Sequence, residues 1–154
     1  MGGTTLTGSS STGWSQTAWS GAGSGCSAYK PQPAWQALDL TITAVCGKRA
    51  VADVSADADP NTGVSVYDTY SYQGMSGWLV FGGTSVASPI VASVYALRGN
   101  ASSIDGSFPY DNTGSLNDVA SGSNGSCGGS ALCTSGRGWD GPTGLGTPSG
   151  TGAF

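Results

Sequence analysis

The residues with the clearest chemical potential are a glycine pair, a threonine and a serine at 82–85 of this 154-residue chain. They stand between an apolar run at 78–81 and a segment in which apolar residues recur at helical spacing. This pattern predicts a buried strand, a tight turn and a helix that begins near Ser85. Such a serine exposes its hydroxyl, and its backbone N–H lacks an intrahelical partner. The two groups can attack a carbonyl carbon and stabilise the resulting oxyanion.

The helix that follows is predicted over 85–98. Val86, Ile90 and Val94 share one face of it, and Gly99 is a suitable C-cap. We expect Pro89 in the first turn, where its missing N–H does no harm. The alternative for Ser85 is an ordinary helix N-cap, because serine is frequent there and short motifs also arise by chance.

The sequence around Ser85 resembles a known nucleophile signature. Gly-Thr-Ser-Val-Ala-Ser-Pro at 83–89 is similar to the Gly-Thr-Ser-x-Ala-x-Pro motif of the subtilisin-like superfamily. Residues 52–63 and 21–36 resemble segments of the sedolisins, the serine-carboxyl peptidases, and occur in the family's order. The resemblance runs from about Gly2 to the C-terminus. It implies an α/β, subtilisin-like fold: the C-terminal portion of a mostly parallel sheet, with flanking helices and long Gly/Ser-rich loops.

Two residue types are absent. The chain has no histidine, and its nine acidic residues are all aspartates. A Ser-His-Asp triad therefore cannot be completed within it. Sedolisins use a Glu and an Asp in place of the histidine and a further Asp at the oxyanion, and all three precede the segment that resembles this chain. The resemblance thus implies that 1–154 is a C-terminal segment of the catalytic domain, truncated on its N-terminal side.

Three aspartates precede Ser85 closely enough in sequence to be considered as its base, namely Asp53, Asp57 and Asp59. A general base must lie within hydrogen-bonding distance of the hydroxyl, and the resemblance gives these residues no such role. Asp-Pro-Asn-Thr-Gly at 59–63 is typical of a turn. We expect all three aspartates to be structural.

A second group of oxygen donors lies near the C-terminus. Calcium takes about six to eight oxygen ligands, from carboxylates and backbone carbonyls. The pattern here resembles the sedolisin calcium site, in which Asp118 and Asp140 would supply carboxylate oxygens and Val119, Gly136 and Gly138 carbonyl oxygens. Water would complete the shell. The alternative is a solvated loop, because Gly-x-Gly-x-Asp is a short pattern.

The four cysteines, at 26, 46, 127 and 133, do not have the spacing of a metal site. Pairing Cys26 with Cys46 and Cys127 with Cys133 is the simplest of the three possible connectivities; four free thiols are the alternative. Disulfides require an oxidising compartment. With 27 glycines and only 9% charged residues, the composition is typical of a secreted, loop-rich protein.

The composition also limits which kinds of binding partner we expect. A net charge of −4 provides no basic face, so we expect no nucleic-acid partner. No apolar run reaches transmembrane length, so we expect no membrane partner. The expected partners are a peptide substrate and the missing N-terminal part of the domain.

Local patterns predict the remaining elements. The expected strands are 2–8, 38–45, 49–56 and 64–70, the last paired antiparallel with 78–81. We expect a short helical turn at 34–38, a loop over 9–28, and mostly turns from residue 100 onward.

The resemblance implies a serine-type endopeptidase of the sedolisin class that hydrolyses peptide bonds at acidic pH with Ser85 as nucleophile. Without the upstream Glu and Asp the chain alone should be inactive. Two other readings stay open: a non-catalytic secreted module that binds calcium or another protein, and a Gly/Ser-rich binding domain with a coincidental motif.

Overall fold

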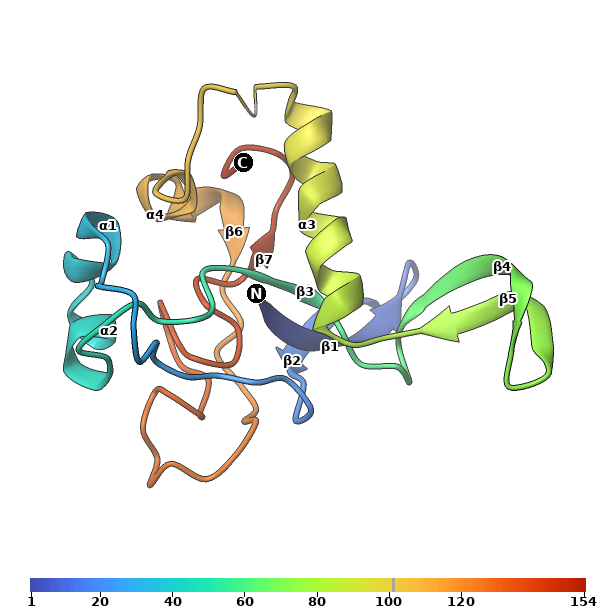
Figure 1. Ribbon diagram of the computed structural model, residues 1–154, viewed down its shortest axis with the longest axis horizontal. Helices are drawn as coiled ribbons and strands as arrows, with labels where there is room; N and C mark the ends of the chain where they lie inside the picture. The colour runs from blue at the N-terminus through green and yellow to red at the C-terminus, as the bar shows by residue number, and fades with distance from the viewer. Residues whose placement is uncertain (101) are drawn as a thin grey trace.

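The structure is a computed structural model that describes residues 1–100 and 102–154. The strands are β1 (Gly2–Ser9), β2 (Gly13–Ala18), β3 (Ser55–Asp57), β4 (Val64–Tyr72), β5 (Met75–Phe81), β6 (Leu116–Asn117) and β7 (Thr147–Pro148). The helices are α1 (Ala34–Ala37), α2 (Leu40–Val45), α3 (Thr84–Arg98) and α4 (Phe108–Asp111), followed by a 3-10 turn, η1 (Thr113–Ser115). Figure 1 shows α3 as the longest helix, beside the small central sheet.

The strands form three small sheets. In the central one, β1 pairs antiparallel with β2 and parallel with β3, where Gly2 lies opposite Ser55. The pairs β4–β5 and β6–β7 are both antiparallel. Among the described strands, β1–β3 is therefore the one parallel pair, so the mostly parallel sheet expected from the sequence is represented here by that pair alone.

Helix α3 packs on β3 and on the C-terminal residues, which places one hydrophobic core directly behind the predicted nucleophile. Ala87 and Val91 are the buried residues of the helix. They form one cluster with Val54, Ala56, Ala58, Ala153 and Phe154. The rings of Tyr95 and Phe154 meet edge to face, with centroids 5.1 Å apart. Burial of this face, rather than helix propensity alone, holds α3 in position.

A second core joins α2 to the C-terminal loops. It consists of Ile42, Cys46, Ala50, Trp139 and Leu145, all buried. The Trp139 indole N–H donates to the carbonyl oxygen of Ala52 at 2.8 Å, so its polar N–H has a hydrogen-bond partner although the ring is buried. Both expected disulfides are present, Cys26–Cys46 and Cys127–Cys133, and the alternative of free thiols is wrong.

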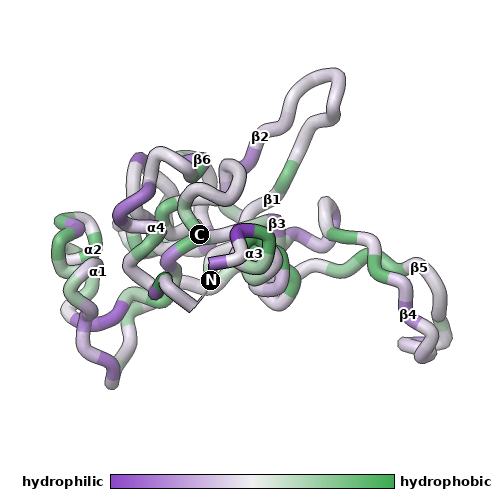
Figure 2. The backbone as a smooth tube through the Cα atoms, turned by 90° about the horizontal axis from the view of Figure 1, so that it is seen from above, coloured by the Kyte–Doolittle hydropathy of each residue, from purple (hydrophilic) through white to green (hydrophobic). Residues whose placement is uncertain are grey.

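The β4–β5 hairpin extends away from the rest of the chain, as Figures 1 and 2 both show. Its antiparallel pairing was predicted and is confirmed. The expectation that 78–81 is buried is wrong: Trp78 is 73% exposed and Val80 is 60% exposed. Since the hairpin meets the body only at its base, the apolar character of β5 does not lead to burial in this chain.

Several element predictions are confirmed in type and place. These are the strand at 2–8, the helical turn at 34–38 and the helix at 85–98, which ends at Gly99 with φ 76° as a C-cap. Other predictions are wrong. Within the expected loop over 9–28 lies β2, which pairs with β1. The expected strand over 49–56 is mostly irregular until Ser55, where β3 begins.

The expected strand at 38–45 is also wrong, because residues 40–45 form helix α2. Asp39 is its N-cap, and its carboxylate accepts the backbone N–H groups of Thr41 and Ile42 at 2.8 and 3.1 Å. These bonds satisfy donors that a helix start leaves unpaired. Ile42 is fully buried in the second core. The capping hydrogen bonds and the burial of Ile42 together favour a helix over the strand that the alternating pattern predicted.

None of the helices in the described part of the chain has the length and apolarity needed to cross a bilayer.

Candidate active site

Ser85 is the second residue of α3, and its side chain is exposed. The N-cap of the helix is Gly83, whose carbonyl oxygen accepts the N–H groups of Val86 and Ala87 at 2.9 and 3.3 Å. The alternative that Ser85 is merely an N-cap is therefore wrong. Within the described residues, neither its hydroxyl nor its backbone N–H forms a hydrogen bond. The hydroxyl and the backbone N–H are therefore both available to interact with a bound ligand.

The turn before Ser85 can be built only from glycine. Gly83 has φ 93° and ψ 158°, a conformation that is essentially restricted to glycine. Its N–H donates to the carbonyl oxygen of Ala58 at 2.5 Å. A Cβ on Gly82 would lie 2.4 Å from the nitrogen of Pro60, so this glycine permits close approach of two backbones. The turn is thereby held against the segment that follows β3.

Pro89 lies in the second turn of α3, not in the first as expected. A proline there cannot donate the N–H that would normally reach the carbonyl of Ser85. Helix α3 nevertheless continues to Arg98. The Ser85 carbonyl therefore lacks its usual donor four residues on, while the Gly83–Ala58 hydrogen bond holds the turn before it.

The aspartates considered as a base are all engaged elsewhere. Thr62 donates its hydroxyl to the Asp57 carboxylate at 3.0 Å. Thr5 donates to Asp59 at 2.8 Å, and the Asn61 N–H does so at 2.9 Å. None of the described carboxylates forms a hydrogen bond with Ser85. The expectation that these residues are structural agrees with this geometry.

The environments of Asp57 and Asp59 shift the pKa values of these two residues in opposite directions. Burial raises the pKa of Asp57, although the bond from Thr62 opposes this. Hydrogen bonds, first from the Asn61 backbone and then from side chains including Thr5, lower the pKa of Asp59. The charge of Asp59 is therefore stabilised by its own turn. This fits a carboxylate that holds the turn at 59–63 in place.

Four of the five residues expected to bind calcium are linked in two pairs by hydrogen bonds from a backbone N–H to a carboxylate. The Gly138 N–H donates to the Asp118 carboxylate at 3.1 Å, and the Gly136 N–H donates to the Asp140 carboxylate at 3.0 Å. Val119 adjoins Asp118 and is buried. Within the described residues, the carbonyl oxygens of Val119, Gly136 and Gly138 accept no hydrogen bond. Unpaired carbonyls beside two carboxylates are a donor set that suits calcium.

Asp140 also organises its own loop. It is fully buried, and its Oδ1 accepts from the Ser135 hydroxyl at 3.3 Å and from the N–H and hydroxyl of Thr143, both at 2.8 Å. Burial raises its pKa, while these bonds favour the charged form. Oδ2 accepts only the Gly136 N–H among the described donors. This oxygen is the one that retains capacity for a cation.

No cluster of three or more acidic, cysteine or histidine side chains occurs among residues 1–100 and 102–154. The calcium site expected from the sequence would not require one, because three of its five expected ligands are backbone carbonyls. Asp118 is exposed, so a cation could enter from solvent.

A partly buried polar network that sequence reasoning missed surrounds Asp53. Its carboxylate pairs with Arg49 and accepts from the Tyr110 hydroxyl at 2.8 Å and from Gln36 at 2.9 Å. Gln36 also accepts the Ala50 N–H at 2.9 Å and is fully buried. The one sequence signal was Gln36 itself, within the Pro-Ala-Trp-Gln segment similar to sedolisins.

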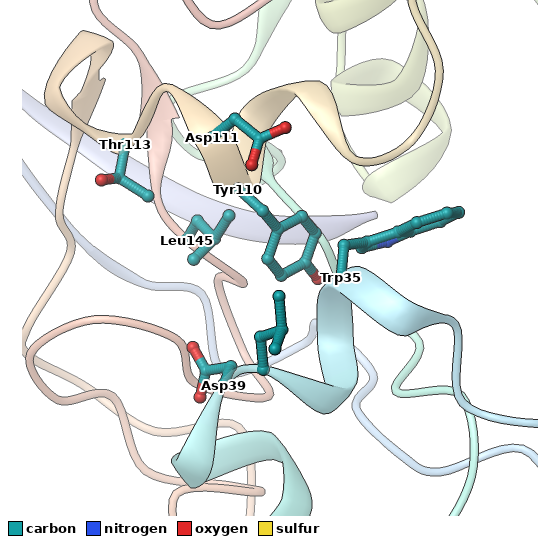
Figure 3. Close-up of a pocket in the computed structure, with 7 residues that line it drawn as sticks. Trp35, Asp39, Tyr110, Asp111, Thr113 and Leu145 are labelled. Carbon is teal, nitrogen blue, oxygen red and sulfur yellow. The ribbon is translucent and has the colours of Figure 1, made fainter.

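A small hollow opens beside this network. Figure 3 shows the Tyr110 ring next to Trp35, with Leu145 close by and the carboxylates of Asp39 and Asp111 at its margin. Ser85 is not among the residues that line it. The hollow is therefore separate from the predicted nucleophile.

No family model matches the chain. Sedolisin from Pseudomonas sp. (strain 101) is 36% identical over 133 residues, which are 81% of this chain and 21% of that protein. Tripeptidyl-peptidase SED1 from Arthroderma otae is 36% identical over 121 residues, or 73% of this chain and 17% of that protein.

A solved structure also matches: Pseudomonas sedolisin, a serine-carboxyl proteinase complexed with two molecules of pseudo-iodotyrostatin. The TM-score is 0.75 at 32% sequence identity, over 97% of this chain and 43% of that chain. This match shows a subtilisin-like α/β fold. The chain belongs to the sedolisin family and corresponds to the C-terminal region of its catalytic domain. It spans about a fifth of the length of the curated relatives it matches.

Proposed function

We propose that this chain is the nucleophile-bearing segment of a serine-carboxyl endopeptidase and that Ser85 attacks the peptide carbonyl. The observation that supports this most strongly is the free Ser85 hydroxyl at the start of α3, beside its own unpaired N–H. That N–H can stabilise the oxyanion of a tetrahedral intermediate. The relatives are a sedolisin and a tripeptidyl-peptidase, so the substrate would be a peptide or protein.

The proton acceptor has to come from outside residues 1–154. We propose that an upstream Glu, oriented by an upstream Asp, accepts the Ser85 proton, and that a further protonated Asp donates to the oxyanion. Carboxyl groups in these roles favour activity at acidic pH. The same upstream part would add parallel strands to the β1–β3 pair. The chain alone, truncated on its N-terminal side, would be inactive.

We also propose that Asp118, Val119, Gly136, Gly138 and Asp140 bind Ca²⁺. The two carboxylates and three unpaired carbonyls support the proposal. When bound, the ion would neutralise the carboxylates and join the segment after β6 to the loop at 136–140. Its contribution would be structural. The two disulfides support a further proposal, that the protein is secreted into an oxidising medium.

The nucleophile is tested with a fluorophosphonate probe on the chain joined to the upstream half of a sedolisin domain. We expect labelling at acidic pH that is lost in Ser85→Ala. The matched control is Ser88→Ala, which removes another exposed α3 hydroxyl; that hydroxyl donates to the Thr84 carbonyl at 3.0 Å. Labelling of the isolated chain, or labelling that survives Ser85→Ala, would contradict the proposal.

The second candidate function is a non-catalytic calcium-binding module. It is favoured by one observation: the described chain contains two carboxylates and three unpaired carbonyls near its C-terminus, and no carboxylate hydrogen-bonded to Ser85. Calcium-dependent stability, together with absence of probe labelling in the joined protein, would support this function over the peptidase.

A further inference from the structure

The turn at 59–63 meets the chain just before the candidate nucleophile at two points. A Cβ on Gly63 would overlap the carbonyl oxygen of Phe81. A Cβ on Gly82 would likewise overlap the backbone of Pro60. At both points the two backbones are so close that only glycine fits between them. A displacement of the turn would therefore be passed on to the residues that lead into α3.

The carboxylate of Asp59 holds this turn to β1 and closes it on itself. Asp59 is buried, and its Oδ2 accepts the Thr5 hydroxyl of β1 at 2.8 Å. Its Oδ1 accepts the backbone N–H and the side-chain amide of Asn61 at 2.9 and 2.8 Å. These bonds, that from the Asn61 backbone most of all, lower the pKa of Asp59. The carboxylate therefore keeps its charge to a more acidic pH than an ordinary aspartate does.

Other bonds also tie this region to β1, but none acts as directly on Pro60. The backbone N–H of Asp59 donates to the Thr4 carbonyl at 3.2 Å, whereas the next residue, proline, has no N–H to donate. Farther along the turn, the Thr62 hydroxyl accepts the Leu6 N–H at 3.2 Å. The bond from a hydroxyl to the charged Asp59 is shorter, and charge-assisted bonds are the stronger kind.

Asp59 also stands between the two residues that touch the glycine turn before Ser85. On one side of it, the Ala58 carbonyl accepts the Gly83 N–H. On the other side, Pro60 lies against the preceding glycine. Only one residue separates Gly83 from Ser85. A continuous set of contacts thus runs from β1 through the Asp59 carboxylate to the nucleophile.

We propose that Asp59 is a positioning residue for the reaction at Ser85. Acting through Pro60 and the glycine turn, its carboxylate keeps the Ser85 hydroxyl where it meets the peptide carbonyl. None of the described hydrogen bonds joins Asp59 to Ser85, so its role is indirect. The inference rests on the proposed function for the identity of the reaction.

The test measures fluorophosphonate labelling of the chain joined to the upstream half of a sedolisin domain. The quantity compared is the rate constant per site that labels. We expect Asp59→Ala to lower it about tenfold or more, because small displacements of a reacting group are costly. A merely structural role would reduce the number of sites that label and leave the rate constant of the remaining sites unchanged. An unchanged rate constant would overturn the proposal.

The matched control is Asp105→Ala. The Asp105 carboxylate accepts the Ser107 N–H, two residues on, at 2.8 Å, just as Asp59 accepts that of Asn61. Asp105 is exposed and precedes α4, so its loss should leave the rate constant unchanged. An equal decrease in Asp105→Ala and Asp59→Ala would overturn the proposal.

The conservative variant Asp59→Asn should restore the rate constant. Its amide oxygen can accept from Asn61, and its amide N–H can donate to the Thr5 hydroxyl, which also accepts. We expect a rate constant within about threefold of the unmodified protein. A decrease as large as that in Asp59→Ala would show that the hydrogen bonds do not position Ser85 and would overturn the proposal.

A milder change tests the link to β1 without removing the carboxylate. Thr5→Val removes one hydroxyl and keeps the branched shape of the side chain. We expect a smaller decrease in the rate constant than in Asp59→Ala, and no further decrease when the two changes are combined, because they break the same hydrogen bond. Fully additive effects would overturn the proposal.

Amide hydrogen exchange on the same proteins reports on the turn without any catalysis. In Asp59→Ala the Gly83 amide should exchange about tenfold faster, because its bond to Ala58 opens more often. The Leu145 amide, which donates to the Asp53 carbonyl at 2.8 Å, is the internal control and should not change. Equal acceleration at both amides would show general destabilisation and would overturn the proposal.

This inference and the proposed function can fail separately. If the unmodified joined protein were not labelled, while Asp59→Ala still accelerated exchange at Gly83 alone, the catalytic role of Ser85 would be wrong and the link from Asp59 to the turn would stand. Normal labelling in Asp59→Ala, with unchanged exchange at Gly83, would refute the role of Asp59 alone.

Discussion

Gly82 lies so close to Pro60 that a Cβ on the glycine would be 2.4 Å from the proline nitrogen. The next residue, Gly83, donates its N–H to the carbonyl of Ala58. Two consecutive glycines therefore join the turn before the nucleophile to the segment that follows β3. The position of Ser85 is set by this contact as well as by helix α3.

Alanine at either glycine should displace Ser85. Gly83→Ala places a side chain at φ 93° and should cost about 1–3 kcal/mol of folding stability. Gly82→Ala forces the two backbones apart and should reduce fluorophosphonate labelling of the joined protein more than it reduces stability. Urea unfolding and probe labelling measure the two effects.

The control for both changes is Gly47→Ala. Gly47 is exposed, and an added Cβ there meets no atom within 4 Å. We expect its stability and labelling to match those of the unmodified protein. If Gly82→Ala also matched it, the close approach to Pro60 would not position the nucleophile.

The two disulfides should contribute unequally to stability. Their cysteines are separated by 20 residues in Cys26–Cys46 and by 6 residues in Cys127–Cys133. On the loop-entropy model, removal should lower the free energy of unfolding by about 3 kcal/mol for the longer loop and about 2 kcal/mol for the shorter. Paired Cys→Ala variants, compared by urea unfolding, test this order. A larger loss from the Cys127–Cys133 variant would contradict it.

Tyr110 should make the protein sensitive to alkaline pH. Burial, and then the charge of Asp53, raise the pKa of Tyr110. Above about pH 10 the unfolded chain releases the phenolic proton while the folded chain retains it, so stability should fall by about 1.4 kcal/mol per pH unit for this group. Tyr110→Phe loses the bond to Asp53 and should be less stable at pH 7. The gap between variant and unmodified protein should narrow above pH 10.

Urea unfolding between pH 7 and pH 11 measures that gap. Tyr70→Phe is the control, because Tyr70 is 81% exposed on β4. A gap that stays constant across this range for Tyr110→Phe would show that the phenol does not retain its proton in the folded protein.

Calcium should raise the melting temperature, and carboxylate variants at the proposed site should abolish the increase. Asp140→Asn also places an amide against the Gly136 N–H, which destabilises the loop even without calcium. The informative quantity is therefore the difference in melting temperature with and without chelator. Asp118→Asn, at an exposed position, should reduce this difference with less effect on the calcium-free protein. Asp111→Asn, on α4, is the control.

An element could be predicted from the sequence when the features that stabilise it lie within its own short segment. The helix at 85–98 was predictable because its apolar face and its C-cap, Gly99, lie within one short segment. Helix α2 was not: its residues alternate as in a strand, and the deciding features are the Asp39 cap and the burial of Ile42 against Trp139. Strand β2 was missed because it is stabilised by β1 and by Gln16, which bonds to Thr4 and Thr147.

The candidate sites divide in the same way. Residue types and spacing placed Ser85 after a glycine turn, and the resemblance to the sedolisins indicated the two carboxylates and three carbonyls near the C-terminus. The absence of histidine and glutamate already excluded a histidine-based triad within this chain. These conclusions needed no coordinates, because they depend on which groups are present and on short-range geometry.

Only the tertiary structure decided which groups meet across the chain. It showed that Asp57 and Asp59 are engaged by Thr62 and Thr5, and that Asp53 joins Arg49 and Tyr110. It also showed that Trp78 and Val80 of the apolar strand at 78–81 remain exposed. Such contacts depend on how distant segments pack, and a one-dimensional pattern does not record that packing.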